Sequence, residues 1–207
     1  MRDMKKDNTL IPASATRRLT RAERRKQLLN TAFLIVREEN ADRLTLGNLA
    51  VRAGVSKPVV YDHFATRSAL LIELYRWIDR ERVRIFTEMM TTTLRSPQET
   101  VQMLAHAYIN CAADKTDEFH SVGAALAGSE EKSAVFQELL DNCVAMFVSI
   151  LTPHVTMSPR SLQQCCIGLV GAGEAFSAAF ARGQLNQKEA VASFASLITG
   201  AIHVSES

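Results

Sequence analysis

The sequence is poor in cysteine, in aromatic residues and in long apolar runs. Its 207 residues include four cysteines and no C-x-x-C pair, and only 6% of the residues are aromatic. Two of the cysteines, Cys165 and Cys166, are adjacent. Such a set suits neither a disulfide framework nor a zinc site, so we expect reduced thiols, no metal and a cytoplasmic protein.

The chain also lacks a secretory signal and a clear membrane span. Residues 1–15 are polar and charged, without the apolar core that a signal peptide requires. The most apolar stretch, CCIGLVGAGEAFSAAFA, is short for a membrane-spanning helix and carries Glu174 within it. We expect a buried helix there and no membrane partner.

Signatures of common enzymes are missing as well. The sequence holds no G-x-S-x-G, no H-E-x-x-H and no phosphate-binding loop. The GAG at residues 171–173 lacks the third glycine of a nucleotide fingerprint. An enzyme, or a helical protein that only sequesters a small molecule, is therefore disfavoured, and we expect no catalytic residue and no cofactor.

Charge is distributed unevenly along the chain. Residues 1–90 contain 18 Lys and Arg against 11 Asp and Glu, a balance of +7, whereas the remainder contains 6 against 11, a balance of −5. A basic surface can simply be solvated, but a basic bias beside a binding motif indicates contact with a polyanion. The first part of the chain is therefore the candidate nucleic-acid-binding part.

Helix start signals recur along the chain, and no strand-like alternation interrupts them. Thr20 with Glu23, and Ser96 with Glu99, form the pattern of a capping box, and Pro97 suits a first helical position. The pattern predicts an all-α protein. The expected helices cover about 21–40, 46–53, 57–63, 67–93, 97–113, 117–127, 130–152, 159–182 and 187–203.

Residues 46–63 fit a helix-turn-helix. Two short helical patterns flank Gly54, which supplies a turn conformation that a residue with a Cβ adopts only at a cost. A helix start suits phosphate, a lysine there suits phosphate or guanine, and small apolar groups suit the thymine methyl. The residues predicted to contact DNA are Thr45, Ser56, Lys57, Pro58, Val59, Tyr61, His63, Thr66 and Arg67.

Some of these residues keep an alternative. Tyr61 and His63 could pack between helices rather than bind phosphate. The run TRRLTRAERRK, residues 16–26, is either a solvated basic face or a flexible arm in the minor groove. Arg76, Arg80 and Arg84 form an i,i+4 stripe that we interpret as a solvated face.

The stretch TLGNLAVRAGVSKPVVYDHFATRSALLIELY, residues 45–75, resembles the DNA-binding domain of the TetR family of transcriptional regulators. Its most specific part is G-V-S-K-x-x-x-Y-x-H-F followed by T-R-x-A-L. Gly47 and Ser68 depart from the family pattern, in which a helix former and an acidic residue are usual. By position, the residues that match the family's DNA-contacting places are Thr45, Ser56, Lys57, Tyr61, His63 and Arg67.

The resemblance implies a three-part organisation. Residues 1–18 would be a disordered basic arm, and residues 19–65 a three-helix helix-turn-helix domain. Residues 66–207 would form a six-helix domain for dimerisation and effector binding. The protein would then be a homodimeric repressor that a small apolar or aromatic effector releases from double-stranded operator DNA. In the alternative, the larger domain binds no small molecule and only dimerises or recruits a protein.

Small residues mark the expected dimer face, because they let helices approach closely. The alternative is close packing inside one subunit. The predicted dimer residues are Gly168, Gly171, Ala172, Ala175, Ala178, Ala179, Phe194, Leu197, Ile198 and Ala201.

The predicted effector pocket is mainly apolar, and each of its residues could equally belong to an ordinary core. His106 and Glu174 are its candidate polar anchors, although a satisfied core histidine is the simpler interpretation of His106. The set comprises Phe86, Met89, Met103, His106, Ala107, Cys111, Phe119, Val122, Cys143, Phe147, Val170 and Glu174.

Overall fold

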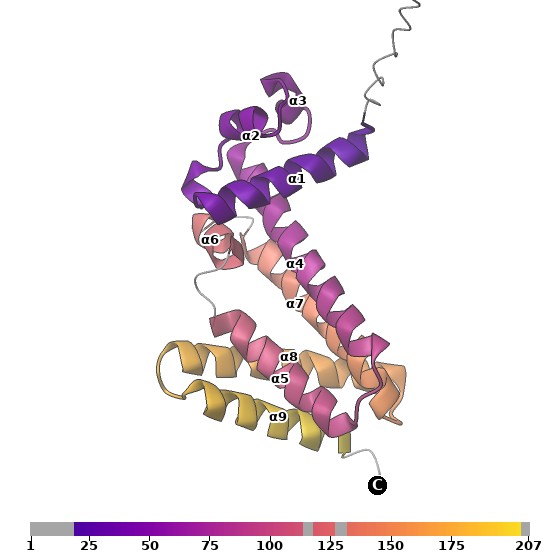
Figure 1. Ribbon diagram of the computed structural model, residues 1–207. Helices are drawn as coiled ribbons and strands as arrows, with labels where there is room; N and C mark the ends of the chain where they lie inside the picture. The colour runs from indigo at the N-terminus through magenta and orange to yellow at the C-terminus, as the bar shows by residue number, and fades with distance from the viewer. Residues whose placement is uncertain (1–18, 114–117, 127–131, 204–207) are drawn as a thin grey trace, which may run out of the picture.

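The computed structural model describes residues 19–113, 118–126 and 132–203, and these ranges contain α-helices and short 3-10 turns but no strand. The predicted all-α fold is therefore confirmed, whereas the basic arm expected over residues 1–18 lies outside the described residues. The elements are α1 (Arg21–Glu38), η1 (Ala41–Arg43), α2 (Leu46–Arg52), α3 (Lys57–Tyr61), α4 (Arg67–Thr92), α5 (Pro97–Ala113), α6 (Glu118–Ala125), α7 (Lys132–Leu151), η2 (Thr152–His154), α8 (Pro159–Ala181) and α9 (Gln187–His203) (Figure 1).

Local capping signals explain where several helices begin. The Thr20 hydroxyl accepts a hydrogen bond from the backbone N–H of Glu23, and the Glu23 carboxylate accepts one from the N–H of Thr20. Ser96 and Glu99 repeat this arrangement at α5. Both predicted capping boxes are confirmed, and each satisfies two backbone donors that a helix start leaves unpaired. At α3, Ser56 takes the cap position but makes no side-chain hydrogen bond there.

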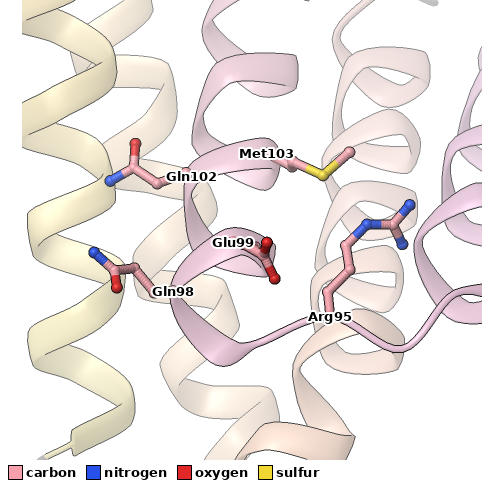
Figure 2. Close-up of a pocket in the computed structure, with 5 residues that line it drawn as sticks. All are labelled: Arg95, Gln98, Glu99, Gln102 and Met103. Atoms are coloured by element: carbon pink, nitrogen blue, oxygen red, sulfur yellow. The ribbon is translucent and has the colours of Figure 1, made fainter.

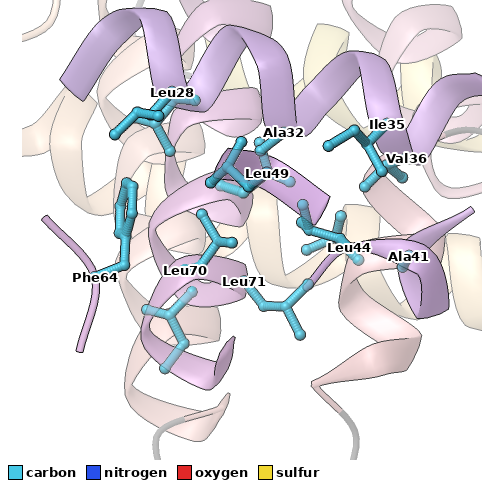
Figure 3. Close-up of a cluster of buried hydrophobic side chains, with 14 of the residues drawn as sticks. Leu28, Ala32, Ile35, Val36, Ala41, Leu44, Leu49, Phe64, Leu70 and Leu71 are labelled. Carbon is cyan, nitrogen blue, oxygen red and sulfur yellow. The ribbon is translucent and has the colours of Figure 1, made fainter. Parts of the chain in front are cut away.

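A first hydrophobic core lies under the N-terminal helices (Figure 3). Leu28 and Ile35 of α1, Leu49 of α2 and Leu70 of α4 are fully buried in it. The core continues into the C-terminal part of the chain, because α6 and the start of α7 add Val122, Leu126, Val135 and Leu139. The domain boundary expected at residue 66 therefore does not separate two cores.

A second core joins α5, α8, α9 and the C-terminal half of α7. The Tyr108 ring packs edge-on to Phe147 and Phe194, with centroid distances of 5.7 and 5.6 Å. Gly173 makes room for this ring, since a Cβ at that position would lie 2.6 Å from Tyr108 Cε1. The long helices α4 and α7 extend between the two cores (Figure 1).

Two segments, Ala134–His154 and Pro159–Ala181, are long and apolar enough to cross a membrane by length and composition. Both supply side chains to the second core, as interior helices of globular proteins do.

Candidate nucleic-acid interface

A tight turn sets α3 against α2. Gly54 has a φ of +64°, the left-handed conformation in which a side chain is disfavoured, as its place between the two helical patterns predicts. The Val55 N–H donates to the Ala50 carbonyl at 3.0 Å and so closes the turn. Val60, which is fully buried, then anchors α3 to the first core. The backbone thus fixes which side of this short helix faces solvent.

The residues predicted to contact DNA lie mostly on the surface. Ser56, Lys57, Pro58 and Tyr61 are exposed, and Val59 is half-buried. The packing alternative for Tyr61 is disfavoured because 55% of this residue is exposed.

Two further members of the predicted DNA set are helix caps. The hydroxyl oxygens of Thr45 and Thr66 accept hydrogen bonds from the N–H groups of Asn48 and Ala69, both at 3.0 Å. Each threonine is exposed and retains a hydroxyl proton that it can donate to a phosphate.

Gly47 lies beneath the Lys57 side chain. A Cβ at residue 47 would lie 3.9 Å from Lys57 Cε, which is ordinary van der Waals contact. The lysine stem therefore crosses the first turn of α2 at the point where this sequence departs from the family pattern. The glycine leaves the backbone of α2 uncovered by any side chain of its own.

His63 is half-buried near the end of α3. Burial lowers its pKa, and the neighbouring charges of Arg21 and Arg25 lower it further. Its Nδ1 atom is buried without a hydrogen-bond partner among the described residues. A neutral imidazole can donate a hydrogen bond to phosphate but adds no charge to that contact.

Arg67 is committed to the protein backbone. Its Nε donates to the carbonyl oxygen of Leu44 and its Nη2 to that of Ala41, both at 2.8 Å. These bonds tie the start of α4 to the connection between α1 and α2. The sequence suggested a phosphate clamp, but only Nη1 would be left for that contact, because the other two nitrogens satisfy backbone acceptors.

Two arginines of α1 brace the end of α3, a role that the sequence did not predict. Arg21 Nη2 donates to the carbonyl oxygen of Asp62 at 3.3 Å, and Arg25 Nη1 donates to that of His63 at 3.0 Å. Arg25 also lies over the Phe64 ring, 4.9 Å from its centroid. The last carbonyls of a helix lack intrahelical partners, so these arginines supply them. The i,i+4 spacing of the two arginines was the available signal.

The predicted effector pocket is not brought together as one set. Phe147 and Val170 are buried in the second core, and Phe86, Met103 and Cys143 pack against it. Ala107 and Glu174 are half-buried, whereas Val122 belongs to the first core. Met89, His106 and Cys111 are exposed, and the side chain of Phe119 lies outside the described residues.

His106 corrects the expectation of a core histidine. It is exposed, and its ring lies within hydrogen-bonding distance of the Asn110 side chain, one turn further along α5. The i,i+4 spacing places the two side chains on one helix face, and that face is turned to solvent.

Glu174, the other predicted anchor, has a buried partner that sequence reasoning missed. The Tyr108 hydroxyl donates to Glu174 Oε1 at 2.8 Å. Burial, and the adjacent Glu174 carboxylate, raise the pKa of Tyr108, so the phenol stays protonated. Burial likewise raises the pKa of the nearby Cys143 thiol to about 12, which makes it a packing group rather than a thiolate.

Two hollows lie at the surface of the larger domain. One, of about 390 Å³, is lined by Arg95, Gln98, Glu99, Gln102 and Met103 (Figure 2). Its charged groups already serve the fold, since Arg95 donates to carbonyls at the end of α4 and Glu99 caps α5. The other, of about 470 Å³, lies between α8 and α9 and is lined by Phe176, Ser193, Ser196, Leu197, Gly200 and Ala201.

The predicted dimer face is divided between surface and core. Phe194 and Ile198 are fully buried inside the subunit, so the packing alternative holds for them. Leu197 is 44% exposed and lines the second hollow. Among the small residues, Gly168, Gly171 and Ala175 are exposed, and Ala172, Ala178, Ala179 and Ala201 are half-buried.

Comparison with known proteins assigns the helix-turn-helix segment. Residues 28–74 match the model of bacterial regulatory proteins of the tetR family. An 86-residue segment is 38% identical to the HTH-type transcriptional activator FasR of Mycolicibacterium smegmatis, and the match covers 40% of this chain and 39% of that protein. The chain thus spans well under half of the length of this curated relative.

Solved structures extend the similarity of fold to nearly the whole chain. A tetR-family transcriptional regulator from Streptomyces coelicolor superposes with a TM-score of 0.56 at 19% identity, over 89% of this chain and 84% of that one. The SmeT–triclosan complex gives a TM-score of 0.54 at 15% identity, over 86% of this chain and 90% of that one. Members of the family are transcriptional regulators rather than enzymes. By the DNA-binding segment that residues 28–74 form, this chain belongs to the tetR family of bacterial regulatory proteins.

Proposed function

We propose that the protein is a sequence-specific DNA-binding regulator that inserts α3 into the major groove. The observation that carries the proposal is the exposed run Ser56 to Tyr61 on a helix whose other side is locked to the first core by Val60. Lys57 would bind phosphate or guanine, and Pro58 and Val59 would meet a thymine methyl. Thr45, Tyr61 and Thr66 would bind phosphates on either side of the groove.

The regulator would act as a homodimer formed through α8 and α9. One short recognition helix offers few base contacts, and two-fold related half-sites about 34–36 Å apart are the usual solution. The exposed small residues of α8 and the apolar hollow around Leu197 support this face, because they allow close helix contact across a two-fold axis.

The larger domain would bind a small apolar or aromatic effector that releases the protein from its operator. SmeT, a protein of the same fold, forms a complex with triclosan, an aromatic molecule, and this supports the same class of effector here. The ligand must bind the DNA-incompetent state more tightly than the competent state. The competing sign of regulation is activation, because the curated relative is named an activator.

Direct DNA binding tests the first part of the proposal. Fluorescence anisotropy would measure affinity for the region upstream of the protein's own gene as salt is varied. Lys57→Ala should weaken binding and lower the salt slope by about one, since it removes one phosphate neutralisation. Lys188→Ala, on α9, is the matched control and should leave both quantities unchanged. Equal affinity and slope for Lys57→Ala and the control would contradict the role of Lys57.

Light scattering after size exclusion tests the dimer. Gly171→Arg should give a monomer, because Gly171 is exposed and its Cβ position has nothing within 4 Å in the subunit. Ala134→Arg, at an exposed position on α7, is the control and should remain dimeric. A thermal-shift screen of small aromatic molecules then separates an effector-binding domain from one that only dimerises.

A further inference from the structure

A continuous series of polar contacts joins the end of α3 to α7. Arg25 Nη1 donates to the His63 carbonyl at 3.0 Å, and Arg25 Nη2 lies 2.9 Å from Glu73 Oε2. The other oxygen of Glu73 lies 3.6 Å from Arg76 Nη1. Arg76 Nε then donates to Glu138 Oε2 at 2.7 Å. We call Arg25, Glu73, Arg76 and Glu138 the polar relay.

The polar relay crosses every element between the recognition helix and the larger domain. Arg25 belongs to α1, Glu73 and Arg76 to α4, and Glu138 to α7, which lies along α4 (Figure 1). Each arginine contacts a partner on either side of it, so neither can move without changing two contacts. Isolated surface ion pairs contribute little to stability, but alternating charges in a network hold each other in place.

The other arginines of the α4 stripe do not take the same course. Arg84 pairs with Glu81 and Glu88 of its own helix, at 3.1 and 3.0 Å. These contacts stabilise α4 locally and connect it to nothing else. Arg76 differs because its second partner, Glu138, lies on another helix, which divides the stripe that the sequence presented as one solvated face.

A second polar link fixes the register of α4 against α7. Asn142 Nδ2 donates to Asp79 Oδ2 at 2.7 Å, and Asp79 is only 7% exposed. Asp79 lies one turn after Arg76, and Asn142 one turn after Glu138, so both links join the same two helix faces. A slide or rotation of α7 along α4 must therefore strain the Arg76–Glu138 contact.

We propose that the polar relay couples the packing of α7 on α4 to the placement of the recognition helix. Glu138 and Arg76 are positioning residues for DNA binding, acting through Glu73 and Arg25 on the last carbonyl of α3. This inference rests on the proposed function, because its main readout is operator affinity. It adds to that proposal a defined route by which a change in the larger domain reaches α3.

The sign of one substitution separates the polar relay from general electrostatics. Glu138→Gln removes a negative charge, and general attraction to a polyanion would then strengthen DNA binding. The polar relay predicts the opposite, a weakening of about threefold or more, as expected for coupling through a packed network. The salt slope should stay the same, since no phosphate contact is lost.

The measurement uses the full chain and a duplex that the wild-type protein selects from a randomised pool. Glu88→Gln is the matched control, because it breaks a carboxylate pair that stays within α4. It should bind as the wild type does, or slightly more tightly. Arg76→Lys keeps the charge but offers one nitrogen instead of the fork that contacts Glu73 and Glu138, and it should weaken binding as Glu138→Gln does.

Combination with Arg25 tests whether the contacts act as one unit. The double variant Arg25→Gln, Glu138→Gln should lose no more affinity than the weaker-binding single variant, whereas independent effects would multiply. Multiplied losses, or Glu138→Gln binding as tightly as the control, would overturn the proposal.

Hydrogen exchange in the absence of DNA provides a readout independent of the proposed function. Amides of residues 57–64 should exchange faster in Glu138→Gln than in wild type or Glu88→Gln, because the brace on α3 is loosened. If the wild type selects no duplex sequence, the proposed function fails and the exchange experiment still decides on the polar relay. Unchanged exchange in this segment would refute it.

Discussion

Arg67 at the start of α4 donates hydrogen bonds to the carbonyl oxygens of Leu44 and Ala41, both at 2.8 Å. Leu44 and Ala41 are buried, so these acceptors have little access to water. The arginine therefore closes the corner between α1 and α2 from a distance of more than twenty residues along the chain.

Arg67→Ala should destabilise the fold by about 1–3 kcal/mol, because it leaves buried carbonyls without a donor. Urea denaturation measures this loss. Arg43→Ala, at an exposed position in η1, serves as control and should change the free energy of unfolding little. If Arg67→Ala instead kept full stability and lowered the salt slope of DNA binding by about one, Arg67 would be a phosphate clamp after all.

Gly47→Ala should stabilise the protein by up to ~1 kcal/mol, since alanine favours a helix and its Cβ meets Lys57 Cε at an ordinary 3.9 Å. The same change at Gly54 should destabilise by about 1–2 kcal/mol, because a Cβ is disfavoured at its positive φ. Chemical denaturation of both variants gives opposite signs if the turn is built as described. A shared sign would contradict the assignment of one of the two glycines.

Asp79→Asn should raise the free energy of unfolding at pH 7. Burial raises the pKa of Asp79 in the folded protein above its ordinary value of 3.8, and the Asn142 hydrogen bond only partly opposes this. The folded state then binds more protons than the unfolded state, so stability falls as pH rises from 3.8 through the raised pKa.

The gain from Asp79→Asn should accordingly be larger at pH 7 than at pH 3. Denaturation curves at the two pH values measure the difference. Asp141→Asn, at an exposed position on α7, is the comparison and should show no such pH dependence. A gain for Asp79→Asn that is equal at both pH values would remove ionisation as its cause.

Gly173→Ala should destabilise the larger domain by about 1–3 kcal/mol, because the new methyl group would lie 2.6 Å from Tyr108 Cε1. The ring has no simple escape, since it packs against Phe147 and Phe194. Thermal unfolding compares this variant with Gly47→Ala, the same substitution at an open helical position. Equal melting temperatures for Gly173→Ala and wild type would show that the ring moves freely.

Sequence patterns predicted what depends on neighbours in the chain. Both capping boxes were foreseen because their partners are three residues apart, and Gly54 because a turn between two short helices needs its conformation. The same reasoning placed Val60 in the core. In each case the physical cause lies within one or two helical turns.

Contacts between distant segments could not be predicted in this way. Arg67 and Arg25 bond backbone carbonyls 23 and 38 residues away, and a carbonyl has no side-chain signal in the sequence. The α9 pattern was ambiguous for another reason. Phe194 and Ile198 lie on the buried face of that helix and Leu197 on the exposed one, a difference that composition does not reveal.

The first core has a consequence for how such regulators can be recombined. Val122, Leu126, Val135 and Leu139 complete the apolar interior of the DNA-reading part, although they come from far along the chain. A fragment that stopped after α4 would expose the faces these side chains cover. The reading head is therefore not a detachable module, and an exchange of sensors between two relatives must carry α6 and the first turns of α7 together with the head they support.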